Sequence, residues 1–153
     1  MSKILVALDF SANAHLVAEQ GEVLARSLNA ELHLLHVLAD WSYYAGVEYS
    51  PILGYTNTDF GAHQTIQQED LNESARQYLI KTKTYLNHPK TFIHVKEGRL
   101  DDVVNKLVEE YDFDYLVIGS HSRSTFDAIF MGSNTEKVIK NISIPTLIIP
   151  IRE

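Results

Sequence analysis

Short apolar runs recur along the chain with helix-like segments between them, and this alternation constrains the fold most. The first run, residues 4–8, is an almost unbroken apolar stretch, as a strand buried on both faces of a parallel sheet requires. Further strands are expected at residues 31–38, 91–96, 115–118 and 146–151. Strands that alternate with helices are joined by right-handed crossovers. The sequence therefore predicts an α/β fold, an open doubly wound sheet of five parallel strands in the order 3-2-1-4-5, with helices on both faces.

The segments between the runs carry apolar residues at helical spacing. The clearest is residues 100–111, where apolar side chains fall at i, i+3, i+4, i+7, i+8 and i+11. Other helices are expected at residues 12–28, at residues 63–86 and after Ser133. Ser11 is expected to cap the helix at residues 12–28. Because the sequence shows no repeat and no linker, we expect residues 1–153 to form a single domain.

Composition excludes several classes of function. The chain has 153 residues, of which 45% are hydrophobic and 22% charged, as in ordinary globular proteins. Its 13 basic and 20 acidic side chains give a formal charge of −7 without a dense basic run, so no nucleic-acid partner is expected. No cysteine is present, which fits a reducing compartment. Without a signal-like start or an apolar run near the roughly 20 residues of a membrane helix, we expect a cytoplasmic protein and no membrane partner.

Residues 119–134 have the character of an anion-binding segment. Gly119 follows an apolar strand-like run, and a glycine there lets the backbone turn sharply and approach a ligand. Thirteen residues later, Gly132 and Ser133 begin a helical pattern, and the free N–H groups of a helix N-terminus attract anions. Glu136, three residues after Ser133, has the spacing of a capping box. An ordinary strand–turn–helix connection with two structural glycines fits these residues equally well.

The same residues resemble the motif of the universal stress protein family. That family has Gly, two residues, Gly, nine residues and then Gly-Ser or Gly-Thr, and this chain matches with Gly119, Gly132 and Ser133 but has Ser122 in place of the second Gly. The resemblance covers nearly the whole chain. Residues 3–11, 34–37 and 144–150 are similar to the first, second and last strands of the family, and residues 39–62 are unlike anything fixed in it.

The resemblance implies a nucleotide site at one end of the sheet. In an open doubly wound sheet, ligands lie outside the carboxyl ends of the strands, where the strand order reverses. Members of the family that bind ATP have an acid matching Asp9 in the adenosine pocket, a backbone matching Val37 at the adenine edge, and the glycine-rich segment around the ribose and phosphates. The site residues implied are Ala7, Asp9, Val37, Gly119, His121, Ser122, Arg123, Gly132, Ser133 and Asn134.

Several of these residues also have a purely structural interpretation. Asp9 could instead cap the first helix or turn, and His121 could be a solvated loop histidine. The aromatic side chains of residues 41–55 could cover the adenine, although packing on the sheet is favoured. The pairs Asp101–Asp102 and Glu109–Glu110 are expected on solvated helix faces.

Three histidines lie in strand patterns, His33, His36 and His94. They are expected to be packed and hydrogen-bonded, because no pair has the spacing of a zinc site. We assign no metal-binding and no catalytic residue.

Ser122 is the one departure from the family motif. Glycine permits a positive φ, and a serine that had to adopt the left-handed region would cost about 1 kcal/mol. That cost corresponds to about tenfold in affinity, although the hydroxyl could donate to a phosphate. On this argument, the change Ser122→Gly is expected to tighten ATP binding if the segment is a phosphate site.

The resemblance implies a stress-response protein that binds ATP, with Mg²⁺, as a regulatory switch. Slow ATP hydrolysis at most is expected, because no Walker lysine motif and no nucleophile setting occur in the sequence. A dimeric interaction module without nucleotide and a slow ATPase are the alternatives. The apolar final strand, residues 146–151, would lie at the sheet edge and is expected to pair with its own copy in a homodimer. Members of the family commonly dimerise in this way.

Overall fold

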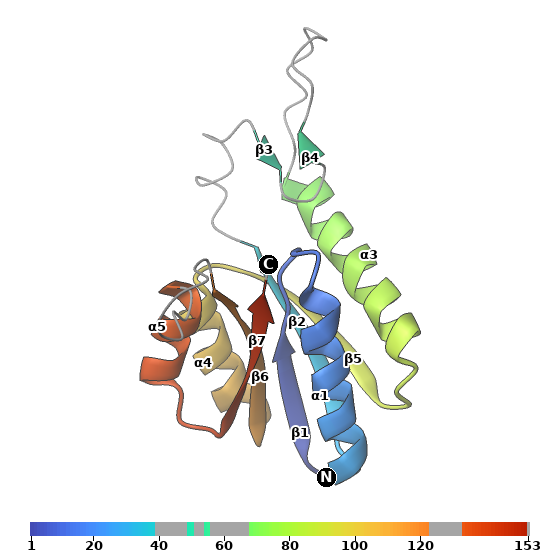
Figure 1. The fold of residues 1–153 in the computed structure, drawn as a ribbon, viewed down its shortest axis with the longest axis vertical. Coiled ribbons are helices and arrows are strands. Elements are labelled where there is room, and N and C mark those ends of the chain that lie inside the picture. The colour runs from blue at the N-terminus through green and yellow to red at the C-terminus, as the bar shows by residue number, and fades with distance from the viewer. Residues whose placement is uncertain (39–48, 51–53, 56–67, 123–132, 153) are drawn as a thin grey trace, which may run out of the picture.

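One parallel sheet forms the centre of the molecule in the computed structural model, which describes residues 1–38, 49–50, 54–55, 68–122 and 133–152. The sheet has five strands in the order β5-β2-β1-β6-β7, all neighbours parallel (Figure 1). Its strands are β1 (Lys3–Ala7), β2 (Glu31–Leu38), β5 (Thr91–Glu97), β6 (Tyr115–Ser122) and β7 (Thr146–Arg152). The predicted order 3-2-1-4-5 is confirmed. A separate antiparallel pair, β3 (Tyr49–Ser50) and β4 (Gly54–Tyr55), lies within residues 39–62, the segment that resembles nothing fixed in the family.

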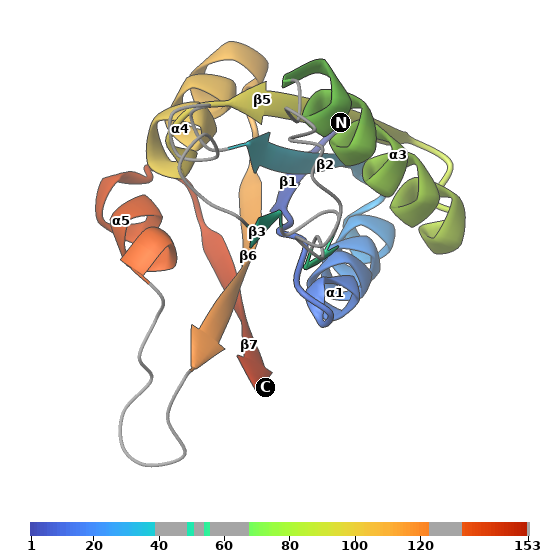
Figure 2. The ribbon, with the colours of Figure 1, turned by 90° about the horizontal axis from the view of Figure 1, so that it is seen from above.

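Helices cover both faces of the sheet, as predicted. The helices are α1 (Ala14–Leu28), α3 (Gln68–Leu86), α4 (Leu100–Tyr111) and α5 (Ser133–Asn141). Seen from above, α1 and α3 lie on one side of the sheet and α4 and α5 on the other (Figure 2). Successive strand residues point to opposite faces, so Ile4 and Val6 pack in the α1–α3 core whereas Leu5 packs in the α4–α5 core. Strands β1 and β2 are buried on both sides, which explains why their sequences are mostly apolar.

Three helices end at a residue in the left-handed region. These residues are Asn29 (φ 50°), Asn87 (φ 48°) and Asp112 (φ 53°), and each begins the turn from a helix into the next strand of the sheet. Asn and Asp are the non-glycine residues that adopt this conformation most readily, because their short polar side chains bond locally. The sequence predicted the helix ends at Asn29 and Asn87, and both are confirmed.

Some boundaries differ from the prediction. Helix α1 begins at Ala14, with Asn13 in the cap position, so the prediction that Ser11 caps it is wrong. The carbonyl of Ser11 accepts the Ala14 N–H at 3.1 Å, whereas its buried hydroxyl oxygen has no hydrogen-bond partner among the described residues. Strand β6 continues four residues beyond Ile118, because β7 pairs with it as far as Arg152. The first part of the helix predicted at residues 63–86 lies outside the described residues.

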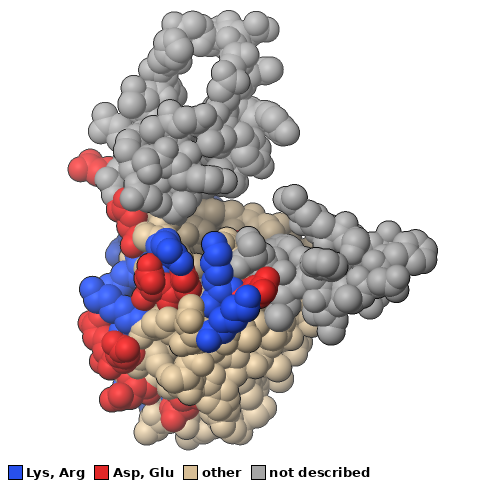
Figure 3. All heavy atoms as spheres, turned by 90° about the vertical axis from the view of Figure 1, so that its left-hand side faces the viewer, with Lys and Arg blue, Asp and Glu red and all other residues tan. Residues whose placement is uncertain are grey.

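Charges of both signs are interspersed on the side of the molecule that carries α4 and α5 (Figure 3). Two ion pairs account for part of this pattern, Arg99–Asp101 at 2.8 Å and Lys140–Glu136 at 2.7 Å. Asp101 is only 7% exposed, so the prediction that it lies on a solvated face is wrong; Arg99 satisfies its carboxylate. Among the helices that the structure describes, none is long and apolar enough to cross a membrane.

Candidate functional site

Several of the expected ligand-binding residues lie at the same end of three neighbouring strands. Ala7, the last residue of β1, is opposite Leu35 of β2 and Ile118 of β6. Val37 lies two residues beyond Leu35, and Gly119 lies one residue beyond Ile118. The structure therefore brings Ala7, the Asp9 turn, Val37 and Gly119 to the carboxyl edge of the sheet. Ala7 is buried, Val37 is half-buried and Asp9 is exposed.

The backbone of Val37 points toward the space beyond the end of β1. In a parallel strand, successive residues direct their N–H and C=O groups to alternate sides. The Leu35 carbonyl accepts the Leu8 N–H at 2.8 Å, on the β1 side, and the Leu38 carbonyl accepts the Gly98 N–H at 2.9 Å, on the β5 side. The N–H and C=O groups of Val37 must then point to the β1 side, as those of Leu35 do. They do so beyond the point where β1 ends. These groups can recognise the edge of a planar ligand.

Asp9 caps the turn that follows β1. Its Oδ1 atom accepts the backbone N–H of Ser11 at 3.0 Å, which is the turn-capping role that the sequence left open. The residue is exposed at the carboxyl end of β1. A carboxylate placed there can also accept hydrogen bonds from a ligand.

Two side chains from other elements hold the carbonyl groups of the same turn. His36 Nδ1 lies 2.8 Å from the Leu8 carbonyl oxygen, and since a carbonyl only accepts, Nδ1 carries the proton. The Tyr78 hydroxyl on α3 donates to the Asp9 carbonyl at 3.0 Å. The ring of Phe10 packs against both, with centroid distances of 3.9 Å to His36 and 5.0 Å to Tyr78. Sequence reasoning assigned Tyr78 only to a helix face; the missed signal was a tyrosine on the apolar face of a helix, whose ring packs while its hydroxyl bonds a partner.

Burial keeps both donors neutral. It lowers the pKa of His36, against a smaller raising effect of its bond to Leu8 and of the Asp9 charge. Burial and the Asp9 carboxylate raise the pKa of Tyr78 to about 12. The tyrosine hydroxyl therefore keeps its proton throughout the physiological range.

Gly119 lies inside strand β6 rather than at a sharp turn. A Cβ atom on Gly119 would approach Ile151 Cδ1 to 2.7 Å and Val17 Cγ2 to 2.9 Å, so β7 and α1 pack where a side chain would be. The Gly119 carbonyl accepts the Thr135 hydroxyl of α5 at 2.9 Å. The expectation of a sharp turn at Gly119 is wrong, because pairing with β7 keeps the chain extended. The glycine has a packing role in this structure.

Two further residues expected in the nucleotide site, His121 and Ser122, are the last residues of β6. They pair with Ile151 and Arg152 of β7. The backbone of His121 is therefore part of a strand, and the interpretation that places it in a loop is wrong. Ser122 has the extended backbone of a strand, which any residue adopts. The free-energy cost expected for a serine in the left-handed region therefore does not apply to Ser122 in this structure.

The remaining expected site residues belong to the start of α5 or lie outside the described residues. Ser133 and Asn134 form the first turn of α5, and Thr135 links that turn to β6 at Gly119. Arg123 and Gly132 lie outside the described residues, as do Trp41, Tyr43 and Tyr44 of the aromatic segment. The structure thus places the N-terminal turn of α5 beside the carboxyl end of β6.

Comparison with known proteins identifies the family. The model of the universal stress protein family matches residues 1–150. The chain belongs to this family. Universal stress protein A of Escherichia coli (strain K12) is 27% identical over 151 residues, which cover 98% of this chain and 94% of the relative.

Solved structures of universal stress proteins share the fold. One from Archaeoglobus fulgidus aligns with a TM-score of 0.70 at 19% identity, over 97% of this chain and 98% of the other. The structure of the universal stress protein from A. fulgidus in complex with dAMP aligns with a TM-score of 0.66 at 19% identity, over 97% and 98%. A universal stress protein in complex with cAMP aligns at 0.60 with 18% identity, over 97% and 95%.

The strand histidines of this universal stress protein are packed and hydrogen-bonded, as predicted. His33 Nδ1 lies 2.9 Å from His94 Nε2, and the pair packs among three rings, with His33 stacked on Phe92 and edge-on contacts to Tyr111 and Phe113. Burial, followed by the neighbouring His33, lowers the pKa of His94 to about 4, and burial lowers the pKa of His33. Across the described ranges, no three or more His, Asp or Glu side chains are grouped as metal ligands.

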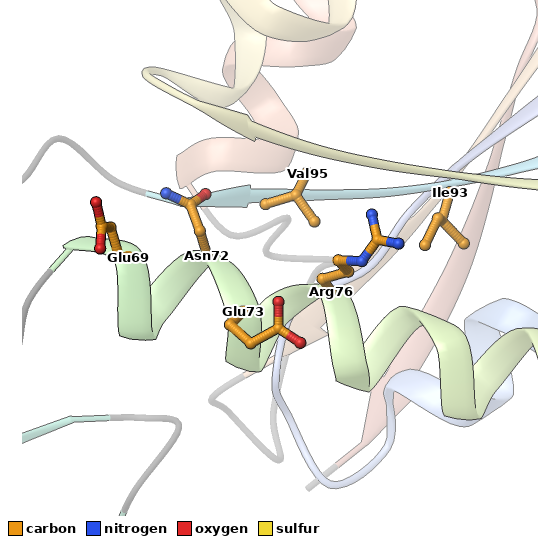
Figure 4. A pocket seen from close by; sticks show the side chains of 6 residues that line it. All are labelled: Glu69, Asn72, Glu73, Arg76, Ile93 and Val95. Carbon is orange, nitrogen blue, oxygen red and sulfur yellow. The ribbon is translucent and has the colours of Figure 1, made fainter.

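A hollow lies between α3 and β5, and its lining includes none of the expected site residues that the structure describes. It encloses about 400 Å³. Figure 4 shows the Arg76 side chain extending along the sheet beside Ile93 and Val95, with Glu69, Asn72 and Glu73 on the same helix. Its lining brings charges of both signs to a partly apolar floor, so it selects no single class of ligand.

Proposed function

We propose that this universal stress protein binds an adenine nucleotide, ATP with Mg²⁺, at the carboxyl ends of β1, β2 and β6, as a regulatory switch in the stress response. The observation that carries the proposal is the Thr135–Gly119 hydrogen bond, because it holds the first turn of α5 at the end of the sheet where Asp9 also lies. Helix N-termini favour anions such as phosphate. The dAMP and cAMP complexes of proteins with this fold support an adenosine ligand.

In this proposal, three parts of the site each bind a different part of the nucleotide. The backbone of Val37 meets the adenine edge, since its groups face the space beyond β1. The Asp9 carboxylate lies beside the adenosine, and the N–H groups of Ser133 and Asn134 face the phosphates. Ala7, His121, Ser122, Arg123 and Gly132 complete the proposed set.

The residues present are compatible with Mg²⁺ bound mainly by the nucleotide. Mg²⁺ keeps several waters and takes one or two protein oxygens in addition to phosphate oxygens, so a cluster of three protein ligands is unnecessary. The ion would neutralise part of the triphosphate charge.

Isothermal titration calorimetry with ATP, ADP, AMP and GTP, with and without Mg²⁺, tests the proposal. We expect heat with the adenine nucleotides, weaker binding of GTP, and weaker binding of ATP by the variant Asp9→Ala. The absence of heat with all four at millimolar concentration would end the idea and favour an interaction module without nucleotide. Phosphate release measured on the same samples separates binding from slow hydrolysis.

The change Ser122→Gly tests the phosphate segment itself. Because Ser122 has extended backbone in this structure, glycine relieves no strain and removes a hydroxyl donor. We therefore expect ATP binding to weaken by about three- to tenfold if the hydroxyl bonds a phosphate. Unchanged affinity would indicate a simple strand–helix connection, and tighter binding would show that the bound state needs a left-handed residue.

We also propose a homodimer through residues 146–151 of β7. This strand is last in the sheet order, so its outer edge has no strand partner within the described chain. Leu147 on this strand is 42% exposed, and an apolar open edge favours pairing with another strand. The cytoplasmic location and the lack of a nucleic-acid partner remain predictions from composition.

A further inference from the structure

We propose that Tyr78 and His36 are positioning residues for the nucleotide site, which fix the Asp9 carboxylate by holding the backbone carbonyls of its turn. The inference rests on the proposed function, since it concerns the same site. It assigns a ligand-binding role to α3, the helix that carries Tyr78. None of the residues expected to bind the nucleotide belongs to that helix.

The turn after β1 lacks the support that a strand would give. Strand β1 ends at Ala7, and one further ladder bond joins the Leu8 N–H to Leu35. Beyond that bond, the bonds recorded for the Leu8 and Asp9 carbonyls come from side chains. Each accepts a side-chain donor, His36 from β2 at 2.8 Å and Tyr78 from α3 at 3.0 Å. Two consecutive carbonyl groups are thus fixed by two different elements.

Fixing these carbonyls also fixes the direction of the Asp9 side chain. The Leu8 and Asp9 carbonyls belong to the peptide groups on either side of the Asp9 Cα atom, so holding both fixes the direction of its Cα–Cβ bond. Phe10 restricts rotation of these peptide groups, because its ring packs between His36 and Tyr78. The Ser11 N–H, 3.0 Å from Asp9 Oδ1, then holds one carboxylate oxygen. A ligand that bonds Asp9 meets a carboxylate that is already oriented.

Helix α3 provides a matched control for the Tyr78 hydroxyl. Tyr85 lies seven residues later on the same helix, and its hydroxyl donates to Glu19 Oε1 of α1 at 2.6 Å. Both hydroxyls join α3 to another part of the chain. Tyr85, however, is 66% exposed, and its hydroxyl bonds Glu19 whereas that of Tyr78 bonds the Asp9 carbonyl. The variants Tyr78→Phe and Tyr85→Phe therefore remove the same atom with different expected effects on the site.

The first experiment measures the turn without nucleotide, by amide hydrogen exchange of Ser11. We expect Tyr78→Phe to speed this exchange by about three- to tenfold, because the Asp9 peptide loses one constraint. Tyr85→Phe should leave it at the wild-type rate. Equal Ser11 exchange in wild type, Tyr78→Phe and Tyr85→Phe would overturn the positioning role.

The second experiment measures ATP affinity in a double-mutant cycle of Tyr78→Phe with Asp9→Asn. If Tyr78 acts through the Asp9 carboxylate, Tyr78→Phe weakens ATP by about three- to tenfold in the wild type and has little further effect in the Asp9→Asn background. A role limited to stability would instead leave the affinity unchanged while lowering the melting temperature. Equal weakening in both backgrounds would show that Tyr78 acts by another route.

His36 is tested by rescue. The variant His36→Asn keeps an N–H donor near the position of Nδ1, whereas His36→Leu removes it, so affinity should be largely retained in the first and reduced in the second. If His36→Leu does not fold, the Tyr78 cycle decides the inference. A wild type that binds no nucleotide would overturn the proposed function and this inference together. A wild type that binds ATP with affinity unaffected by Tyr78→Phe would overturn this inference alone.

Discussion

Gly119 belongs both to the proposed phosphate segment and to the core of the sheet. The atoms that a Cβ would meet, on Ile151 and Val17, come from β7 and α1, so the glycine lets a strand and a helix approach β6 closely. The nucleotide motif alone would explain the glycine by ligand contact. The structure adds a packing reason that holds with or without a ligand.

The change Gly119→Ala is therefore expected to destabilise the protein by about 1–3 kcal/mol, because the added methyl group overpacks the core. Urea unfolding measures the loss. The change Ile151→Val shortens the nearer side chain and should cost about 0.5–1.5 kcal/mol by itself. The double variant with Gly119→Ala and Ile151→Val should lose less free energy of unfolding than the two single variants lose in sum. Additive losses would contradict the contact.

The sequence predicted the positions of Asp9, Val37 and Gly119 at the sheet edge, because carboxyl ends of parallel strands meet at one edge. It could not predict the bonds that hold them. Tyr78 is 69 residues from Asp9, and Thr135 is 16 residues from Gly119. Such bonds depend on how α3 and α5 dock, which no local pattern encodes.

Strands β2 and β5 join through a pair of histidines as well as through their ladder. His33 and His94 share one hydrogen bond, in which one nitrogen donates and the other accepts. Glu31 lies 3.6 Å from His33 Nε2, and Lys3 and Lys96 oppose a positive charge on the pair. Protonation of both rings would place two donors against each other.

Stability should therefore fall on acidification. The pKa of His94 is lowered to about 4, so the unfolded chain, with a usual histidine pKa near 6.5, binds more protons between these values. The stabilisation is present above pH 6.5 and is lost as the pH falls toward 4. We expect urea unfolding to show lower stability at pH 5 than at pH 7.5. The variant His94→Gln should show a smaller loss, and an equal loss would assign it to other groups.

The helices and strands themselves were predictable where apolar spacing was regular. Helix α4 matches its pattern from Leu100 to Tyr111, and its Val104, Leu107 and Val108 are buried. The predictions that were wrong depend on contacts that form only in the folded chain. Strand β6 is longer because β7 pairs with it, and Asp101 is buried because Arg99 neutralises it.

At the scale of the whole molecule, the sheet has two unlike edges. Strand β5 ends with the charged residues Lys96 and Glu97, whereas β7 is apolar apart from its ends. Charged side chains discourage pairing between sheet edges. This contrast favours β7 over β5 as the edge that pairs in a two-fold dimer.

The change Leu147→Lys tests the dimer, because it adds a charge to the exposed face of β7. We expect light scattering at micromolar concentration to show a dimer for the wild type and a monomer for this variant. Leu16→Lys is the control, since Leu16 on α1 is 40% exposed and Leu147 is 42% exposed. Ile149→Lys is less clean, because Ile149 also packs against the core. A monomeric wild type would refute the dimer, and a dimer unaffected by Leu147→Lys would move the interface elsewhere.

The left-handed residues Asn29, Asn87 and Asp112 have a consequence for engineering. All three follow helices and lead into strands, so they lie at the amino end of the sheet, opposite the edge that carries Asp9 and Gly119. Glycine adopts the left-handed region without the cost of about 1 kcal/mol that other residues bear. A more heat-resistant version of this protein can therefore be sought at one end of the sheet while every group that would meet a ligand stays unaltered at the other.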